Sequence, residues 1–359
     1  MISEMLTYYT LGKDRQLNEV VVAGTHDAGI TSGGDGVQTQ TLNILQQALV
    51  GVRFFDVRIA AAVTSQTHAS GRPVAELRAF HADDKVVMKL DRNVVLKGSD
   101  NGVRVKQSKL AGGAFGLGLT AMLEQARDFV RSPMGSNEFL MLKFDKCTNW
   151  AHIANACWAT LGTTLYTAGG NLNKKTLDEL HGKVIVLFSS SGLSVLGANT
   201  RGILGFKNLN ESGSSYDAGY NGLQYFGKGG TSPFNPVNKL KQNIKKQKKL
   251  MKGAAAMQDP EVIGMMYWTT TGLIESIKKR DDGMWDAPNI AKLKNLWGQG
   301  LGDFVNARVS LPSTNPLADA QQRRSFFPNI VMIDFADQAK CQRIRDLNDL
   351  TVHHLSDLT

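Results

Sequence analysis

The sequence predicts an α/β protein built on a TIM-type (β/α)8 barrel. Strand-like and helix-like segments alternate along the 359 residues. Most strand-like segments are continuous apolar runs, as expected for a parallel sheet that is covered on both faces. Charged or proton-carrying side chains follow several of these runs. A parallel barrel places its chemistry at the carboxyl ends of its strands, so we expect these side chains to meet at one end of the barrel.

Eight segments have a strand-like pattern, in chain order 19–23, 53–59, 77–82, 138–144, 183–188, 222–226, 262–269 and 329–335. Helix-like segments separate many of them, at 41–49, 119–130, 150–165 and 174–180. The glycine-rich stretch 111–118 has no lysine after it, so we interpret it as a flexible insertion. The chain has no internal repeat and no boundary that would split the barrel, which predicts a single catalytic domain over residues 1–359.

Composition fits a globular protein. The hydrophobic fraction is 42% and the charged fraction is 20%, and no apolar run is long enough to span a bilayer. The three cysteines are far apart and lack the spacing of metal ligands. The first residues do not have the pattern of a classical secretion signal. We therefore expect either a cytoplasmic protein or one secreted without such a signal, peripheral at membranes, and we expect a monomer.

The most informative segments are 20–29 and 51–59. In the first, an apolar run ends at a glycine and is followed by His26 and Asp27. In the second, strand alternation places Asp56 and Arg58 on the same face. Two charges on one face of a buried strand are costly unless they pair or bind something. A histidine moves protons and an arginine holds phosphate, so the combination indicates phosphoryl chemistry.

These segments resemble the X region of phosphatidylinositol-specific phospholipases C. The Gly-Thr-His-Asp sequence at 24–27 is similar to the motif of the first catalytic histidine, and the strand at 51–58 is similar to the one that follows it. The resemblance continues through a helix and strand at 119–143 and a last strand at 329–335. It implies a distorted TIM-type barrel with insertions.

The resemblance also implies roles for individual residues. His26 matches the general base that takes the proton from the inositol 2-hydroxyl. Asp334, at the end of the last strand, matches the carboxylate that orients this histidine, with Asp337 as a near alternative. His81 matches the general acid that protonates the diacylglycerol oxygen, assisted by Asp27.

The position of the second histidine has two candidates. His68 lies in a turn-like stretch, whereas His81 closes a short apolar run after Phe80. We favour His81 and interpret residues 62–75 as an inserted hairpin.

Arg58 and Lys143 stand where the metal-dependent relatives have acidic residues. Two cations in place of two carboxylates predict a site without a metal or other cofactor, because calcium requires several oxygen ligands. Arg58 then stabilises charge on the phosphate oxygens, and Asp56 orients Arg58. Asp56, Lys143, Tyr225 and Trp268 are the predicted substrate-binding residues. Tyr225, Trp268 and its neighbour Tyr267 end strand-like segments and are expected to stack on a sugar ring or line the cleft.

Residues 239–252 contain seven lysines and no acidic residue, which accounts for most of the net charge of +9. The segment is compatible with a solvated face, a nucleic-acid surface or a surface for anionic lipid. Beside a phospholipase motif set we favour lipid, because basic residues near a membrane contribute about 1 kcal/mol each. The predicted membrane-surface residues are Lys245, Lys246, Lys248 and Lys249.

The resemblance therefore implies a metal-independent phosphodiesterase of the bacterial phosphatidylinositol-specific phospholipase C type, which cleaves phosphatidylinositol, or a related inositol phospholipid, to diacylglycerol and inositol 1,2-cyclic phosphate. The expected partners are this substrate and an anionic membrane surface, and no nucleic acid. Two alternatives remain at this point. One is a non-catalytic lipid-binding barrel, and the other is a metal-dependent phosphodiesterase acting on glycerophosphodiesters or sphingolipids.

Overall fold

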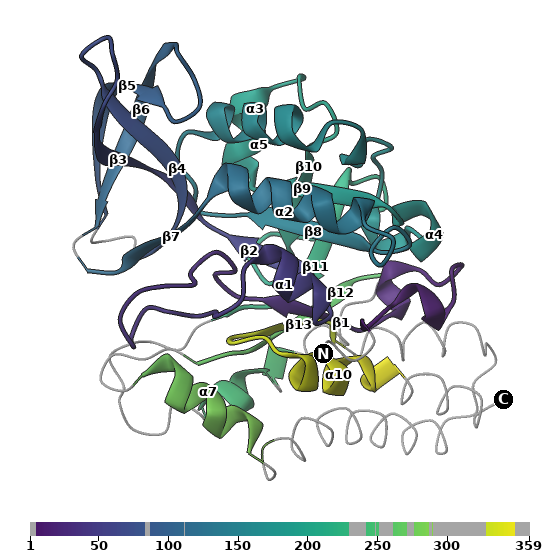
Figure 1. Cartoon of the computed structure of the whole chain (residues 1–359). Helices are drawn as coiled ribbons and strands as arrows, with labels where there is room; N and C mark the ends of the chain where they lie inside the picture. The colour runs from purple at the N-terminus through teal and green to yellow at the C-terminus, as the bar shows by residue number, and fades with distance from the viewer. Residues whose placement is uncertain are drawn as a thin grey trace, which may run out of the picture.

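The structure is a computed structural model that describes residues 5–82, 87–110, 112–229, 242–247, 249–250, 261–270, 276–286, 289 and 328–348. Eight parallel strands close a barrel in the order β1-β13-β12-β11-β10-β9-β8-β2 (Figure 1). Their bounds are β1 Val22–Thr25, β2 Val52–Val57, β8 Phe139–Phe144, β9 Lys183–Phe188, β10 Leu204–Asn208, β11 Gly222–Phe226, β12 Ile263–Trp268 and β13 Pro328–Ile333. The predicted distorted (β/α)8 barrel is confirmed.

Helices cover the outside of the barrel. The α-helices whose bounds lie within the described residues are α1 Ile44–Leu49, α2 Leu119–Arg131, α3 Trp150–Leu161, α4 Leu177–Leu180, α5 Ser190–Leu196, α7 Ile277–Trp285 and α10 Gln338–Arg345. Short 3-10 helices lie at Tyr9–Leu11, Leu17–Glu19, Gly162–Thr164 and Leu172–Lys174. Side-chain caps explain where several helices begin. Asn43 and Thr176 form capping boxes at α1 and α4, and Asp337 accepts from the backbone of Lys340 at the start of α10.

A second sheet is inserted between β2 and α2, and it corrects one sequence prediction. It contains β3 Ile59–Thr67, β4 Pro73–His81, β5 Val87–Leu96, β6 Gly102–Leu110 and β7 Ala114–Gly118. The strand predicted at 77–82 belongs to this sheet and not to the barrel. The eighth barrel strand is instead β10, which was not predicted. The sheet extends from the barrel beside α2 and α3, at the upper left of Figure 1. The stretch predicted as a flexible glycine-rich insertion contributes β7, which pairs with β4.

The apolar core has two layers, one on each side of the barrel wall. The interior layer includes Phe54, Met141, Ile185, Ile263 and Met332. The outer layer lies between the strands and the helices and includes Phe55, Leu142, Val186, Leu123 and Phe129. Phe54 and Phe55 thus lie on opposite faces of β2, as the predicted alternation requires. On each barrel strand, the inward-facing side chains that come after these core residues lie at the carboxyl end of the barrel.

Strand register determines which polar side chains meet at that end. Thr25, the last residue of β1, is paired with Ile333, the last residue of β13. The residues that follow them, His26 and Asp334, are therefore neighbours. Asp56 of β2 is directly paired with Lys143 of β8. Among the helices that the structure describes, none is long and apolar enough to cross a membrane.

Candidate active site

His26 and Asp334 meet where β1 and β13 end. Nδ1 of His26 lies 3.2 Å from Oδ1 of Asp334. The ring of Tyr267, from the interior face of β12, stands edge-on to the His26 ring with centroids 6.3 Å apart. The carboxylate and the aromatic ring restrict the orientation of the imidazole, so the pair has the arrangement of a base and its orienting carboxylate.

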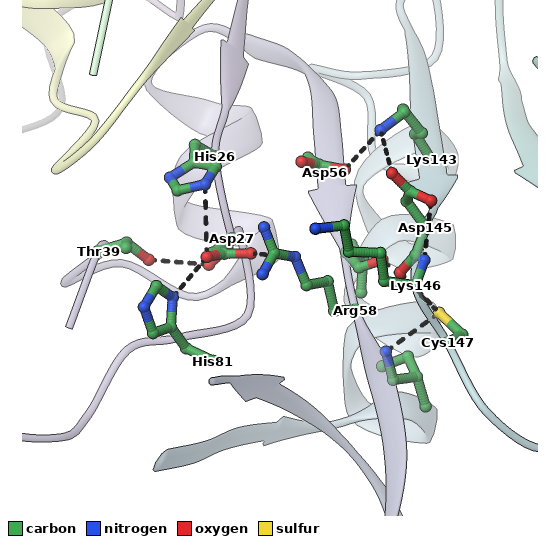
Figure 2. A network of polar contacts seen from close by, with 12 residues as sticks. His26, Asp27, Thr39, Asp56, Arg58, His81, Lys143, Asp145, Lys146 and Cys147 are labelled. Atoms are coloured by element: carbon green, nitrogen blue, oxygen red, sulfur yellow. Dashed lines mark hydrogen bonds and ion pairs between the residues drawn. The ribbon is translucent and has the colours of Figure 1, made fainter. Parts of the chain in front are cut away.

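Asp27 joins three cationic or proton-carrying side chains (Figure 2). Its Oδ2 atom lies 2.6 Å from Nδ1 of His81 and 3.4 Å from Nε2 of His26. Its Oδ1 atom lies 3.2 Å from Nε of Arg58. The backbone of Asp27 turns in the left-handed region, with φ of 44°. This turn brings the carboxylate between the two histidines and the guanidinium.

The structure places His81 at this site and His68 elsewhere. His81 is the last residue of β4, so it comes from the inserted sheet and not from a barrel strand. His68 lies in the turn between β3 and β4, where its Nδ1 is 2.9 Å from Oγ of Ser70. The inserted sheet therefore completes the constellation at the end of the barrel.

Exposure separates the side chains that can reach a ligand from those that orient them. The side chains of His26, Arg58 and His81 are 14%, 18% and 26% exposed. The side chains of Asp27 and Asp334 have 0% exposure. The two histidines and the arginine thus face solvent, and the carboxylates lie behind them.

The buried carboxylates set the charge of the site. Burial lowers the pKa of His26, but the charges of Asp27 and Asp334 outweigh burial and raise it to about 9. For Asp27, burial opposes ionisation, yet Arg58, His26 and His81 hold its pKa well below the usual range. Burial raises the pKa of Asp334, and the hydrogen bond from His26 counteracts that rise. Asp27 is consequently a fixed negative charge beside Arg58 and the two histidines.

Asp56 and Lys143 form a buried ion pair on the other side of Arg58 (Figure 2). Nζ of Lys143 lies 2.9 Å from Oδ1 of Asp56 and 3.5 Å from Oδ2 of Asp145. It also lies 4.7 Å from the centroid of the Phe206 ring. Although burial opposes its charge, Asp56 and the neighbouring groups hold the pKa of Lys143 well above the usual value. The ammonium group is therefore charged and already paired.

Aromatic side chains line the barrel interior near the ion pair of Asp56 and Lys143. Tyr225 of β11 and Tyr267 of β12 belong to the interior core and lie near Lys143 and Asp56. Burial raises the pKa of Tyr225 to about 12, so its hydroxyl stays protonated. The sequence pointed to Tyr225 and to the neighbouring pair Tyr267 and Trp268, but not to Phe206. A parallel strand that is apolar on both faces gives no signal of which residue points inward.

Trp268 is not part of this site. It follows Tyr267 on β12 and therefore points outward, where it is fully buried against α7. Its indole N–H donates to the carbonyl of Met284 at 3.2 Å. The structure thus corrects the prediction of Trp268 as a substrate-binding residue, because strand alternation sends neighbouring side chains to opposite faces.

The basic segment is described in part. Residues 242–247, 249 and 250 are helical, and the side chains of Lys245 and Lys249 are exposed. Lys246 is half-buried, and its Nζ donates to the carbonyl of Gly229 at 2.7 Å. Burial lowers the pKa of Lys246. Lys248 lies outside the described residues. Lys246 thus fastens the helix to the loop after β11, whereas Lys245 and Lys249 face solvent.

Comparison with known proteins identifies the fold. No protein-family model and no curated protein matches the chain. A structure of a variant of phosphatidylinositol-specific phospholipase C from Staphylococcus aureus is 13% identical, with a TM-score of 0.50, and covers 94% of this chain and 95% of that one. Another structure of the S. aureus enzyme, concerned with modulation of its membrane binding, is 15% identical, with a TM-score of 0.50 and coverage of 94% of both chains. The chain therefore has the barrel fold of the bacterial phosphatidylinositol-specific phospholipases C.

Proposed function

We propose that the protein is a metal-independent phosphodiesterase that cleaves phosphatidylinositol, or a related inositol phospholipid, to diacylglycerol and inositol 1,2-cyclic phosphate. One observation carries the proposal. Two partly exposed histidines, His26 and His81, each contact a buried carboxylate, and the partly exposed guanidinium of Arg58 shares the carboxylate of Asp27 with them. Two proton carriers beside one phosphate-binding cation are the groups that an in-line attack on a phosphodiester needs.

In the proposed reaction His26, in its neutral form, accepts the proton of the inositol 2-hydroxyl. The 2-oxygen attacks phosphorus, and the bond from phosphorus to the diacylglycerol oxygen breaks. His81, in its protonated form, donates its proton to that leaving oxygen. Asp334 orients His26, and Asp27 orients His81 through the contact at Nδ1. Each proton transfer of this kind typically contributes about 10²–10⁴-fold to the rate.

Arg58 stabilises the charge that develops on the non-bridging phosphate oxygens. Its Nε faces Asp27, which fixes the guanidinium beside the carboxylate that both histidines contact. The ion pair of Asp56 and Lys143 lies on the far side of Arg58 and places positive charge where a cation-binding site would need oxygen ligands. This arrangement supports chemistry that needs no metal ion.

The inositol ring is assigned to the side of the site where Lys143, Tyr225 and Tyr267 lie. The tyrosines offer rings for stacking and hydroxyl groups for hydrogen bonds to sugar hydroxyls. The diacylglycerol is assigned to the side of His81 and the inserted sheet, because the general acid must contact the leaving oxygen. We propose that residues 1–359 act together as one catalytic domain.

The exposed lysines of the helical residues 242–247, 249 and 250 are assigned to binding an anionic membrane surface. Lys245 and Lys249 face solvent, and basic side chains near an anionic bilayer are attracted to it. Lys246 has a second role in the proposal, because it holds the helix against the loop after β11.

The test is phosphorus NMR of the products formed from phosphatidylinositol vesicles. The proposal expects the resonance of a five-membered cyclic phosphodiester first and a phosphomonoester later, if the ring is opened. A phosphomonoester from the first time point, with no cyclic species, contradicts the mechanism. The absence of any turnover, together with vesicle binding, points to a non-catalytic lipid-binding barrel.

A further inference from the structure

Gln40, a loop residue after β1, is hydrogen-bonded to the ends of both β1 and β13. Its Nε2 donates to the carbonyl of His26 at 3.1 Å and to the carbonyl of Ile333 at 3.2 Å. Its Oε1 accepts from the backbone N–H of Ala336 at 3.0 Å. The side chain is fully buried, so these three contacts replace water entirely. The amide thus connects the segment that carries the proposed base to the turn that follows β13.

Thr39 makes a matching pair of contacts. Its Oγ1 donates to the carbonyl of Asp27 at 2.9 Å, and its own carbonyl accepts from the N–H of Phe335 at 2.7 Å (Figure 2 shows Thr39 against Asp27). Asp27 and Phe335 both lie in the left-handed region, with φ of 44° and 46°. Such a conformation is unfavourable for residues other than glycine and persists only where the surroundings impose it. Each left-handed residue immediately follows a member of the His26–Asp334 pair.

We propose that Thr39 and Gln40, hereafter the Thr39–Gln40 clamp, are positioning residues that hold His26 and Asp334 at hydrogen-bonding distance. The inference rests on the proposed function of that pair. The β1–β13 pairing ends at Thr25 and Ile333, and the last backbone bond between the strands runs from His26 N–H to the Ile333 carbonyl. Beyond that point the two strand ends turn sharply, and the clamp supplies hydrogen bonds to both turns.

Loosening the clamp has a measurable electrostatic consequence. The titratable or charged side chains around His26 are Asp27, Asp334, Arg58, Tyr267 and, beyond Asp27, His81. Asp334 raises the pKa of His26 by its hydrogen bond and its charge, whereas burial and Arg58 lower it. If Asp334 moves away from His26, the pKa of His26 falls.

The experiment replaces Gln40 by methionine, which keeps the length of the side chain and removes its hydrogen bonds. The His26 imidazole is titrated by NMR in the protein without substrate, and turnover of a water-soluble inositol phosphodiester is measured in parallel. We expect the His26 midpoint to fall by about half a pH unit or more. We expect kcat to fall roughly tenfold to a hundredfold with little change in KM, because the base is misplaced and binding is not.

Gln47→Met is the matched control. Gln47 is also a fully buried glutamine, but its Nε2 donates to the carbonyls of Ala28 and Leu42, at 2.9 and 2.6 Å. The control should leave the His26 midpoint and kcat unchanged. A second variant, Thr39→Val, removes only the bond to the Asp27 carbonyl and should shift the midpoint in the same direction by less.

If the midpoint of the His26 titration is unchanged in both Gln40→Met and Thr39→Val, the proposed role of the clamp is wrong. It is also wrong if Gln47→Met shifts this midpoint as much as Gln40→Met does. If Gln40→Met does not fold, Thr39→Val against Gln47→Met decides alone. A wild-type protein without turnover contradicts the proposed function instead, while the NMR titration still reports whether the clamp holds the pair.

Discussion

Nδ1 of His81 lies 2.6 Å from Oδ2 of Asp27, although the first residue belongs to the inserted sheet and the second to the end of a barrel strand. The contact crosses from one sheet to the other and makes the insertion a part of the candidate site. Through Asp27 it also links His81 to His26 and Arg58, so a single buried carboxylate sets the spacing of three groups.

His26→Ala should reduce turnover by roughly 10²–10⁴-fold or more, because the substitution removes the proton acceptor. It should not cause a large loss of stability, because the side chain lies at the barrel rim. Turnover and thermal melting are measured on the same preparation. His68→Ala is the control, since His68 lies in the turn between β3 and β4. Residual activity of His26→Ala within tenfold of wild type would remove this residue from the mechanism.

The pH dependence of kcat/KM should show an acid limb that reflects His26. The base must be neutral, and its pKa is raised to about 9, so kcat/KM should rise with pH towards that value. Asp334→Asn removes a carboxylate that raises this pKa, so the limb should move to lower pH while the plateau falls. The profile is measured with a water-soluble substrate. A limb that does not move in Asp334→Asn argues against the pairing of these residues in the active protein.

Under the proposed metal-independent mechanism chelators should leave the activity intact, because the positive charges of Arg58 and of Lys143, which is paired with Asp56, disfavour a metal ion beside them. Arg58→Asp should give a weak enzyme that responds to calcium, since it adds a carboxylate near Asp56. Arg58→Asn is the control, as it removes the same positive charge without adding an oxygen anion. Loss of wild-type activity in chelator, restored by calcium, contradicts the metal-free account.

The exposed side chains of Lys245 and Lys249 should affect membrane binding and not chemistry. The double variant Lys245→Glu/Lys249→Glu should weaken binding to anionic vesicles at low salt, and the difference should shrink at 1 M salt, where the Debye length is about 3 Å. Lys13→Glu/Arg131→Glu, at exposed positions that precede β1 and β8 and so lie towards the amino end of the barrel, is the control. If turnover of a soluble substrate falls together with vesicle binding, these lysines belong to the site or to the fold.

Much of this architecture was predictable from the sequence, and the exceptions have physical causes. Seven of the eight predicted strands belong to the barrel, because long apolar runs identify buried parallel strands. The one barrel strand that was not predicted, β10, is short and contains glycine, lysine and asparagine, which have low strand propensity. The segment at 77–82 has the pattern of a strand, but local pattern does not say which sheet a strand joins.

The candidate site was likewise predictable in part. Residues next to distinctive motifs, such as His26, Asp27 and Arg58, were identified from the sequence and meet in the structure. Gln40 was missed because nothing in the sequence distinguishes a buried loop glutamine from an exposed one. Trp268 was misplaced because adjacent positions of a strand that is buried on both faces look alike.

Neighbouring variants of β12 test that difference between faces. Trp268→Phe removes the indole N–H that donates to Met284 and should cost about 1–3 kcal/mol of unfolding free energy, with turnover per folded molecule unchanged. Tyr267→Phe keeps the ring in the barrel interior and removes its hydroxyl, so it should lower turnover more than stability. Urea denaturation and turnover are measured for both. The opposite result, with Trp268→Phe inactive but stable, would place Trp268 in the site.

The proposed division of proton transfer between His26 and His81 makes the two histidines respond differently to a change of leaving group. His81→Ala is compared on phosphatidylinositol and on an inositol phosphodiester with a nitrophenol leaving group, which departs without needing a proton. The account predicts a large loss on the lipid and a small loss on the nitrophenyl substrate, whereas His26→Ala should be inactive on both. Equal losses for His81→Ala on the two substrates would contradict its role as the general acid.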